Sequence, residues 1–206
     1  MTKTQGIAYR FIGSILIVIG VLLVAFPFYP LVWYSFTQRT ETQPQPQIFS
    51  EQDFVGTDEQ LPEIGDVTQV QDSPKPLSRI VIDKIGVDMP IVEGSASALE
   101  KGAWRLPLSA HPDQIGNTIL TAHRYKYRPP SSKTFYLLDK LAVGDTFTVY
   151  WNGGEYRYAV DKREIKSPDD PTLLLDTYDR RVTLITCDPL FSTKNRLVVS
   201  GRLLRK

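Results

Sequence analysis

A long run without charged side chains near the N-terminus divides this chain into parts with different physical requirements. Residues 11–36, FIGSILIVIGVLLVAFPFYPLVWYSF, contain no Asp, Glu, Lys or Arg. A helix needs roughly 20 consecutive apolar residues to cross the hydrocarbon core of a bilayer, so this run is long enough. Its final third is rich in aromatic side chains, which suits a membrane interface. We therefore expect residues 1–36 to form a cytoplasmic tail and an uncleaved transmembrane helix.

The charges around this run set its expected orientation. Lys3 and Arg10 precede it, which favours a cytoplasmic N-terminus, whereas Arg39 follows it and weakens that inference. A cleaved signal peptide is the competing interpretation. It is less favoured because no small-x-small cleavage motif follows, and because the run exceeds the usual ~7–15 apolar residues of such peptides. The expectation is a single-pass protein of the cell membrane with the rest of the chain extracellular.

A polar segment, residues 37–77, follows the apolar run. It is rich in Gln, Pro, Asp and Glu, and between Glu41 and Lys75 it carries eight acidic side chains and one basic side chain. It shows neither helical nor strand periodicity. Such a composition cannot bury enough apolar surface to offset the entropy lost on ordering. We expect an extended acidic linker that joins the membrane segment to a folded domain of residues 78–206.

The predicted domain has the sequence pattern of a β protein. Residues 78–94 contain two short β-branched runs around a Gly-containing turn, and GNTILTAH (116–123) begins at a Gly-Asn turn. The clearest hairpin is DTFTVYWNGGEYRYAV (145–160), where alternating side chains flank an Asn-Gly-Gly turn. RRVTLITC (180–187) and NRLVVSGRLL (195–204) complete the set. Seven or eight short strands joined by turns predict a β-barrel or a sandwich.

Other signals are few, and they limit the possible functions. Short helices are expected only in SASALEKG (95–102) and SKTFYLLDKL (132–141). A net charge of +1 gives no reason to expect nucleic-acid binding. The only cysteine, Cys187, excludes a disulfide framework and a multi-cysteine metal site. Since no His, Cys and carboxylate cluster has ligand spacing, neither a metal nor another cofactor is expected.

Three reactive residues stand at the boundaries of predicted strands. His123 closes one strand, Cys187 closes another, and Arg196 opens the last. Together they have the chemistry for acyl transfer: a thiolate attacks a carbonyl, an imidazole protonates the leaving amine, and a guanidinium stabilises the oxyanion. The hydroxyl of Thr186 could add a further donor. A free thiol outside a membrane is a liability unless it is the reagent.

Each of these residues also has an ordinary structural interpretation. A single cysteine in a strand is most often a small core residue, and a single histidine after an apolar strand is most often a hydrogen-bonding residue. Arg196 alone would be a surface cation. The shared position of all three at strand boundaries favours the catalytic interpretation. The other histidine, His111, lies in a Pro- and Asp-containing loop and is predicted to be solvated.

These motifs resemble the sortase family. The residues TLITC (183–187), an arginine-led strand nine residues later and ILTAHR (119–124) upstream match the TLxTC pattern of that family. The resemblance runs from about Ile80 to Leu203. It implies an eight-stranded sortase-type β-barrel with one or two short helices, preceded by the membrane anchor. Sortases are membrane-anchored cysteine transpeptidases, mainly of Gram-positive bacteria.

The resemblance also implies roles for individual residues. Cys187 is the expected nucleophile, His123 the general acid and base, and Arg196 the residue that binds substrate and oxyanion. Thr186 and Ala122 are expected to contact substrate. In the family, the cysteine cleaves an LPxTG-like sorting signal between Thr and Gly. An amine of lipid II, peptidoglycan or a pilin lysine then accepts the acyl group.

The chain departs from the family pattern at some positions. Many sortases have Gly directly before the histidine, where this chain has Ala122 after Thr121, so the sorting motif stays open. Asp188 follows the cysteine, and we expect it to face solvent because an inward carboxylate would oppose thiolate formation. The predicted linker lacks an Asp-Pro-aromatic lid, which favours a class D or class E sortase without deciding between them. The loop of residues 166–179 is expected to cover the pocket.

Two other functions remain as alternatives. One is a different envelope Cys/His acyl transferase, such as an L,D-transpeptidase, although its His and Gly close before the cysteine are missing here. The other is a non-catalytic β-domain, tethered to the membrane, that binds a partner. Substitution of Cys187 distinguishes the enzyme from the binding domain.

Overall fold

The structure is a computed structural model that describes residues 3–26, 47–56, 78–126 and 131–205. The chain forms two compact units, residues 1–42 and 43–206. The first contains the helix α1, Lys3–Ala25. Among the described residues, no helix has the length and apolarity that a bilayer crossing requires. The predicted membrane segment continues through residues 27–36, which lie outside the described residues.

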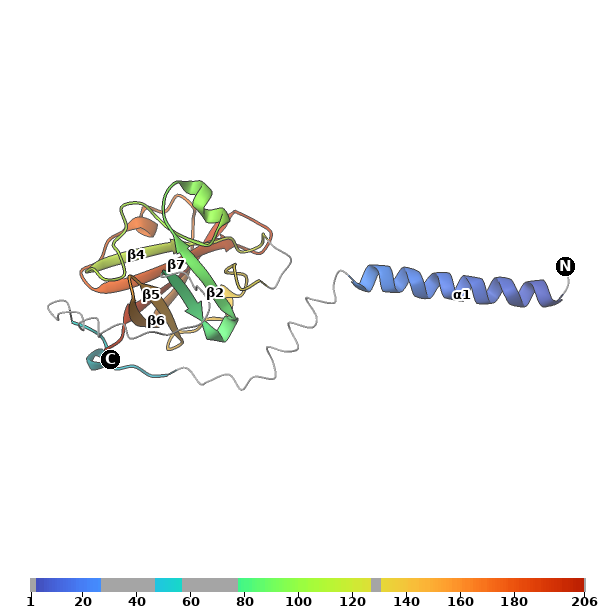
Figure 1. Cartoon of the computed structure of the whole chain (residues 1–206), viewed down its shortest axis with the longest axis horizontal. Helices are drawn as coiled ribbons and strands as arrows, with labels where there is room; N and C mark the ends of the chain where they lie inside the picture. The colour runs from blue at the N-terminus through green and yellow to red at the C-terminus, as the bar shows by residue number, and fades with distance from the viewer. Residues whose placement is uncertain (1–2, 27–46, 57–77, 127–130, 206) are drawn as a thin grey trace. The chain divides into compact units, whose positions relative to one another are not determined.

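The second unit is a closed β-barrel of eight strands in the order β1-β2-β3-β4-β7-β8-β6-β5 (Figure 1). The strands are β1 Arg79–Ile82, β2 Val87–Val92, β3 Ala103–Arg105, β4 Gly116–Thr121, β5 Thr146–Trp151, β6 Gly154–Lys166, β7 Arg180–Asp188 and β8 Asn195–Leu203. The pairs β2–β3 and β4–β7 are parallel, and the other pairs are antiparallel. The predicted all-β barrel is confirmed.

Strand alternation produces the core. Successive side chains of a strand point to opposite faces, so every second residue of each strand enters the barrel. Leu120 of β4, Leu184 of β7 and Val199 of β8 are fully buried inside it. The intervening residues Ile119, Ile185 and Val198 form a second apolar cluster on the outer face, with Leu173 from the β6–β7 loop. A loop therefore covers part of the outer face of β4, β7 and β8.

Short 3₁₀ helices fill the connections between the strands. Two of them, η4 Ala96–Glu100 and η5 Leu138–Lys140, lie in the segments predicted to be helical. Neither η3, Asp83–Ile85, nor η6, Pro171–Leu174, is predicted as a helix by the sequence pattern; in η6 the Asp170 carboxylate accepts a hydrogen bond from the Thr172 backbone N–H. Turns this short have no hydrophobic periodicity, and their ends are set by the surrounding chain.

Residues 47–56 lie against the barrel, although they belong to the segment predicted to be an extended linker. They contain the 3₁₀ helix η2, Glu51–Asp53, and Phe54 forms a β-bridge with Leu204 close to the C-terminus (Figure 1). Phe54 and Val55 are buried. This part of the predicted linker is therefore a component of the folded unit. The other residues of the linker, 37–46 and 57–77, lie outside the described residues.

Candidate active site

The reactive residues come together at one end of β4, β7 and β8. Strands β4 and β7 are parallel and lie side by side, with Thr121 opposite Ile185 (Figure 1). Their C-terminal ends therefore meet at the same edge of the barrel. Strand β8 is antiparallel to β7, so its first residues lie at that edge too. Topology thus gathers two strand ends and one strand start that are far apart in sequence.

Cys187 and Arg196 are direct partners across the antiparallel pair β7–β8. Both share the outer face of the barrel with Ile185 and Val198, because residues two apart in a strand point to the same side. Cys187 is partly exposed. The Nη1 atom of Arg196 donates to the backbone carbonyls of Thr193 and Asn195, each at 3.0 Å. The guanidinium is thereby anchored to the β7–β8 turn beside the thiol.

The remaining donors of Arg196 point to a ligand role. Among the described residues, neither Nε nor Nη2 of this guanidinium has a hydrogen-bond partner. A planar guanidinium carries five N–H donors in a fixed fork, so anchoring through one nitrogen leaves most of them for a carbonyl or an oxyanion. This geometry agrees with the expected role of Arg196.

His123 lies two residues beyond the end of β4, which stops at Thr121 rather than at the histidine. Its backbone carbonyl accepts a hydrogen bond from the N–H of Phe135 at 2.9 Å. Its ring Nε2 lies 3.1 Å from Oε1 of Glu100, which also pairs with Lys126. In the part of the chain that the structure describes, no hydrogen bond joins the ring to Cys187.

The environment of His123 shifts its protonation equilibrium. Partial burial lowers the pKa of this imidazole below its ordinary value, since removal from water disfavours the charged ring. The carboxylate of Glu100 acts in the opposite sense because it favours the imidazolium. A neutral imidazole can accept a proton from a thiol or an amine, as acyl transfer requires.

A mostly apolar groove of about 420 Å³ is lined by Arg196, whereas neither Cys187 nor His123 is among its described lining residues. That volume falls in the range of small-ligand and peptide sites. Ile185 and Arg196 form part of its wall, with Thr121. The rest of its lining is Leu99 of η4, Trp104 of β3, Leu106 directly after β3, and residues of the β6–β7 loop: Pro168, Pro171, Leu173 and Leu174 with the acidic residues Asp169 and Asp170. The loop of residues 166–179 therefore does line the groove, as predicted.

Three leucines of that loop have different environments. Leu173 is buried under the loop against Ile119, Ile185 and Val198, whereas Leu174 and Leu175 are 65% and 58% exposed. Leu173 and Leu174 both line the groove. Leu174 is therefore the leucine with surface available for a ligand.

Thr186 and Ala122 lie on the inner face of the barrel, opposite the side that carries Cys187. They are 2% and 3% exposed, and the Thr186 hydroxyl donates a hydrogen bond to the Ala122 carbonyl at 2.8 Å. The hydroxyl proton is therefore committed to the protein. This geometry favours a role in joining β7 to the end of β4 over the expected contact with substrate.

The expectation that Asp188 faces solvent is wrong. Its side chain is 16% exposed and forms an ion pair with Arg124, which is 8% exposed. Arg124, which follows His123 directly, is a member of this ion pair that the sequence pattern does not predict. The missed signal is parity: Asp188 falls on the same side of β7 as Thr186 and Leu184, which face the barrel interior.

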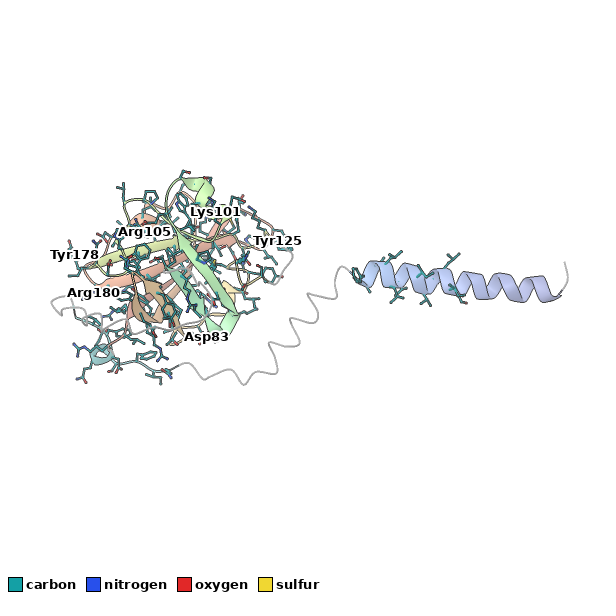
Figure 2. The ribbon with its side chains drawn as sticks, in the orientation of Figure 1. Asp83, Lys101, Arg105, Tyr125, Tyr178 and Arg180 are labelled. Carbon is teal, nitrogen blue, oxygen red and sulfur yellow. The ribbon has the colours of Figure 1, made fainter. Side chains whose placement is uncertain are left out.

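His111 does not belong to the site. It precedes β4, whereas His123 follows it, so the strand separates the two histidines. Its ring stacks on Trp151 with centroids 5.3 Å apart, and Nε2 lies 3.5 Å from a Glu93 carboxylate oxygen. Figure 2 shows the two ends of this region: Tyr125, two residues after His123, lies on the opposite side of the barrel from Arg180, the first residue of β7.

The assembled set is a thiol, an imidazole and a guanidinium on one face beside an apolar groove. Such a set can form a thioester, stabilise the oxyanion that precedes it and protonate a leaving amine. Among the described residues, no group of three His, Cys, Asp or Glu side chains is placed to hold a metal ion.

Comparison with known proteins gives the family. The sortase domain model matches residues 80–204. Sortase D of Bacillus subtilis is 30% identical over 126 residues, a match that covers 59% of this chain and 60% of that relative. Sortase A of Bacillus anthracis is 26% identical over 204 residues, covering 95% of this chain and 94% of that protein.

Solved structures have the same barrel. A crystal structure of sortase C1 from Streptococcus agalactiae is 34% identical, covers 68% of this chain and 73% of its own, and superposes with a TM-score of 0.57. A sortase D5 transpeptidase of Clostridium perfringens is 27% identical, covers 63% of this chain and 79% of its own, and has a TM-score of 0.55. The chain belongs to the sortase family of cysteine transpeptidases.

Proposed function

We propose that this protein is a membrane-anchored sortase that transfers a protein carrying an LPxTG-like sorting signal to an amine of the cell wall. One observation carries the proposal: Cys187 and Arg196 are cross-strand partners, and Arg196 also lines a mostly apolar groove. The reaction is acyl transfer through a thioester on Cys187. The acceptor is lipid II, peptidoglycan or another amine of the envelope.

The first half-reaction forms the thioester. His123 takes the thiol proton of Cys187, and the resulting thiolate forms a C–S bond to the carbonyl carbon of the signal's Thr–Gly bond while the π electron pair of that carbonyl moves to its oxygen. The unpartnered donors of Arg196 are available to hydrogen-bond this oxyanion. The oxyanion collapses, the C–N bond breaks and His123 gives a proton to the leaving amine.

The second half-reaction transfers the acyl group to the acceptor. A neutral amine attacks the thioester carbonyl, and His123 takes a proton from the attacking nitrogen. The tetrahedral intermediate collapses with loss of the Cys187 thiolate. The nucleophile and the base return to their starting states, so the cycle consumes only the two substrates. Water in place of the amine gives hydrolysis.

The groove supports an apolar donor peptide. Its lining is mostly aliphatic and aromatic, with Leu99, Trp104, Leu174 and Ile185, and it also includes Arg196, Asp169 and Asp170. An extended peptide with Leu and Pro at its start can bury those side chains there and present a later carbonyl to Cys187. Burial of apolar surface then supplies binding free energy, and Arg196 fixes the scissile carbonyl.

A transpeptidation assay tests the proposal. The folded unit, residues 43–206, is incubated with a library of LPxTG-type peptides and an amine such as triglycine, and products are identified by mass spectrometry. The proposal predicts a new amide at the Thr carbonyl for at least one peptide and none with Cys187→Ala. A library in which no peptide is cleaved by the folded wild type would contradict it.

The membrane anchor is a separate part of the proposal. Residues 11–36 carry no charge, and the described apolar side chains of α1 are exposed, from Ile15 at 57% to Val24 at 67%. Exposed apolar side chains around a helix need a hydrocarbon environment or a partner. The basic residues before the run place the N-terminus inside and the barrel outside.

The single thiol reports this topology directly. In intact cells, a membrane-impermeant maleimide should label Cys187 of the full chain, and alkaline carbonate should leave the protein in the membrane fraction. Deletion of residues 1–36 should release it from that fraction. Protection of Cys187 until the cells are lysed would contradict an extracellular barrel, whatever the outcome of the transpeptidation assay.

A further inference from the structure

Arg124 is a buried arginine at the centre of a cluster behind the candidate site. Its side chain is 8% exposed, and arginine is almost never so buried unless it is paired. Nη1 donates to the carbonyl of Cys187 at 3.2 Å and to the Asp188 carboxylate. Nη2 lies 3.2 Å from Oδ1 of Asp139. One guanidinium therefore joins its own segment to two others, the end of β7 and η5.

This cluster lies on the opposite side of the strands from the thiol. Asp188 points to the barrel side of β7, as Thr186 does, whereas Cys187 points outward. Arg124 follows His123 as Asp188 follows Cys187. The ion pair thus joins the residues that directly follow the two reactive ones, without entering the groove.

The ion pair between Arg124 and Asp188 connects the two segments beyond the end of the β4–β7 ladder. The last ladder partners of β4 and β7 are Thr121 and Ile185. Beyond them, the Ala122 N–H donates to the Ile185 carbonyl at 3.2 Å, and the Thr186 hydroxyl donates to the Ala122 carbonyl. The next connection between the two segments is Arg124 to Asp188 and to the Cys187 carbonyl. It is the connection nearest to both His123 and Cys187.

The charges in the cluster balance. Arg124 and Lys140 face Asp139 and Asp188, with Lys140 Nζ at 3.3 Å from Oδ2 of Asp139. The other titratable group near the guanidinium is Tyr136, whose pKa is raised by burial. A carboxylate adjacent to a thiolate disfavours the thiolate unless a cation neutralises it. Arg124 supplies that cation.

We propose that Arg124 is a positioning residue that holds His123 in register with Cys187 and neutralises Asp188 so that the Cys187 thiolate can form. The inference rests on the proposed function, since it takes these two residues as the reacting pair. Its test does not need a sorting signal, because alkylation of the only cysteine by iodoacetamide measures thiolate formation directly.

The experiment uses the full chain in detergent and the variants Arg124→Gln, Arg124→Lys, Asp188→Asn and the double variant Arg124→Gln/Asp188→Asn. For each, the alkylation rate of Cys187 is followed from pH 5 to pH 10, with a thermal unfolding midpoint. Arg181→Gln is the matched control. It breaks another part-buried ion pair, Arg181 with Asp161 at 2.8 Å, near the opposite end of β7.

Arg124→Gln should move the alkylation profile to higher pH and slow labelling at pH 7 about tenfold, as expected when a nearby cation is lost. The double variant should return the profile toward wild type, because the carboxylate is removed too. Peptide cleavage by the double variant should stay slow through kcat, since the connection between the two segments is absent. The alkylation profile of Arg124→Lys should lie between the profiles of Arg124→Gln and wild type.

The Arg181→Gln control separates an effect on the alkylation of Cys187 from a general loss of stability. Arg181→Gln should lower the unfolding midpoint and leave the alkylation profile unchanged. An Arg124→Gln profile that matches the Arg181→Gln profile would overturn the proposal. If Arg124→Gln does not fold, Asp188→Asn decides: a profile moved to lower pH supports the proposal, and an unchanged profile overturns it. Absence of peptide cleavage by wild type contradicts the proposed function alone.

Discussion

The guanidinium of Arg196 illustrates how one side chain can be both held and available. Nη1 is fixed by the carbonyls of Thr193 and Asn195, and Arg196 is the cross-strand partner of Cys187. We predict that Arg196→Lys lowers kcat about a hundredfold, the usual cost of losing an oxyanion donor. A lysine ammonium keeps the charge but cannot be anchored and donate to the oxyanion in the same plane.

The control for Arg196→Lys is the same substitution at another arginine of β8. Arg202 lies near the other end of β8, where it pairs with Glu51 and Asp179. Arg202→Lys should therefore leave kcat within about twofold of wild type, as a substitution remote from the reacting atoms does. Steady-state cleavage of a fluorogenic peptide checks both variants. Equal kcat for wild type and Arg196→Lys would rule out an oxyanion role.

Titration of His123 makes the free energy of unfolding depend on pH. Burial lowers its pKa in the folded protein below the ordinary 6.5, so the unfolded chain takes up this proton more readily. The contribution of His123 to stability is complete above pH 6.5 and is lost as pH falls from there toward the folded-state value. Unfolding free energy should thus decrease more between pH 7 and pH 5 in wild type than in His123→Ala.

The same shift can be measured at the ring. In an NMR titration, the His123 ring signals should have a midpoint below 6.5, assigned by their loss in His123→Ala. A midpoint above 6.5 would contradict the prediction. It would mean that the carboxylate of Glu100, 3.1 Å from Nε2, outweighs burial.

The sequence predicts which residues are reactive better than it predicts the direction in which a side chain points. Cys187, His123 and Arg196 stood out because they are rare reactive residues at strand boundaries. The direction of Asp188 follows from its parity with Leu184 and Thr186, but the expected repulsion between a carboxylate and the thiolate outweighed that signal. Its partner Arg124 comes from a loop after a different strand, a contact that only the tertiary structure reveals.

At the scale of elements, β4 and β7 are joined beyond their ladder by the hydroxyl of Thr186. Thr186→Val keeps the shape of the side chain and leaves the buried Ala122 carbonyl without this donor. We predict a loss of about 1–3 kcal/mol in the free energy of unfolding, the cost of an unsatisfied buried acceptor. The KM for a peptide should not change, because Thr186 lies behind the groove.

Chemical denaturation and steady-state kinetics test this prediction together. Thr193→Val is a suitable control, since Thr193 is exposed and its described role is through its backbone carbonyl. A Thr186→Val variant of full stability with a raised KM would instead support direct contact between Thr186 and substrate.

The elements that the sequence predicted share a strong pattern. The hairpin β5–β6 follows from alternation around Asn152 and Gly153, and β7 and β8 follow from β-branched runs. Strand β3, Ala103–Arg105, was not predicted because three residues show no periodicity. It exists because β2 and β4 flank it on both sides. Pairing by neighbours, rather than local propensity, forms this strand.

At the scale of the molecule, the folded unit begins before the first barrel strand. Phe54 packs on Ala159 and Leu204, and the guanidinium of Arg202 lies 4.5 Å over its ring. We predict that Phe54→Ala lowers the free energy of unfolding by about 3 kcal/mol, as loss of a buried aromatic side chain does. Ile48→Ala, at a fully exposed neighbouring position, should have almost no effect.

Urea denaturation of residues 43–206 measures these two changes. Equal stability of wild type and Phe54→Ala would show that residues 47–56 add nothing to the fold. The sequence could not predict this docking because the segment is polar on average. Two of its four apolar residues, Phe54 and Val55, gain their partners from the C-terminal end of β8 and the residue after it.

The central claim is that Cys187 is the nucleophile of an acyl transfer. The most direct measurement is the intact mass of the folded unit during turnover of a cleaved LPxTG-type peptide without an amine acceptor. The account predicts an added mass equal to the acyl part of the peptide, located on Cys187 and removed by hydroxylamine, and no adduct in Cys187→Ala. Cleavage by wild type with no adduct, or an adduct at another residue, would contradict the account.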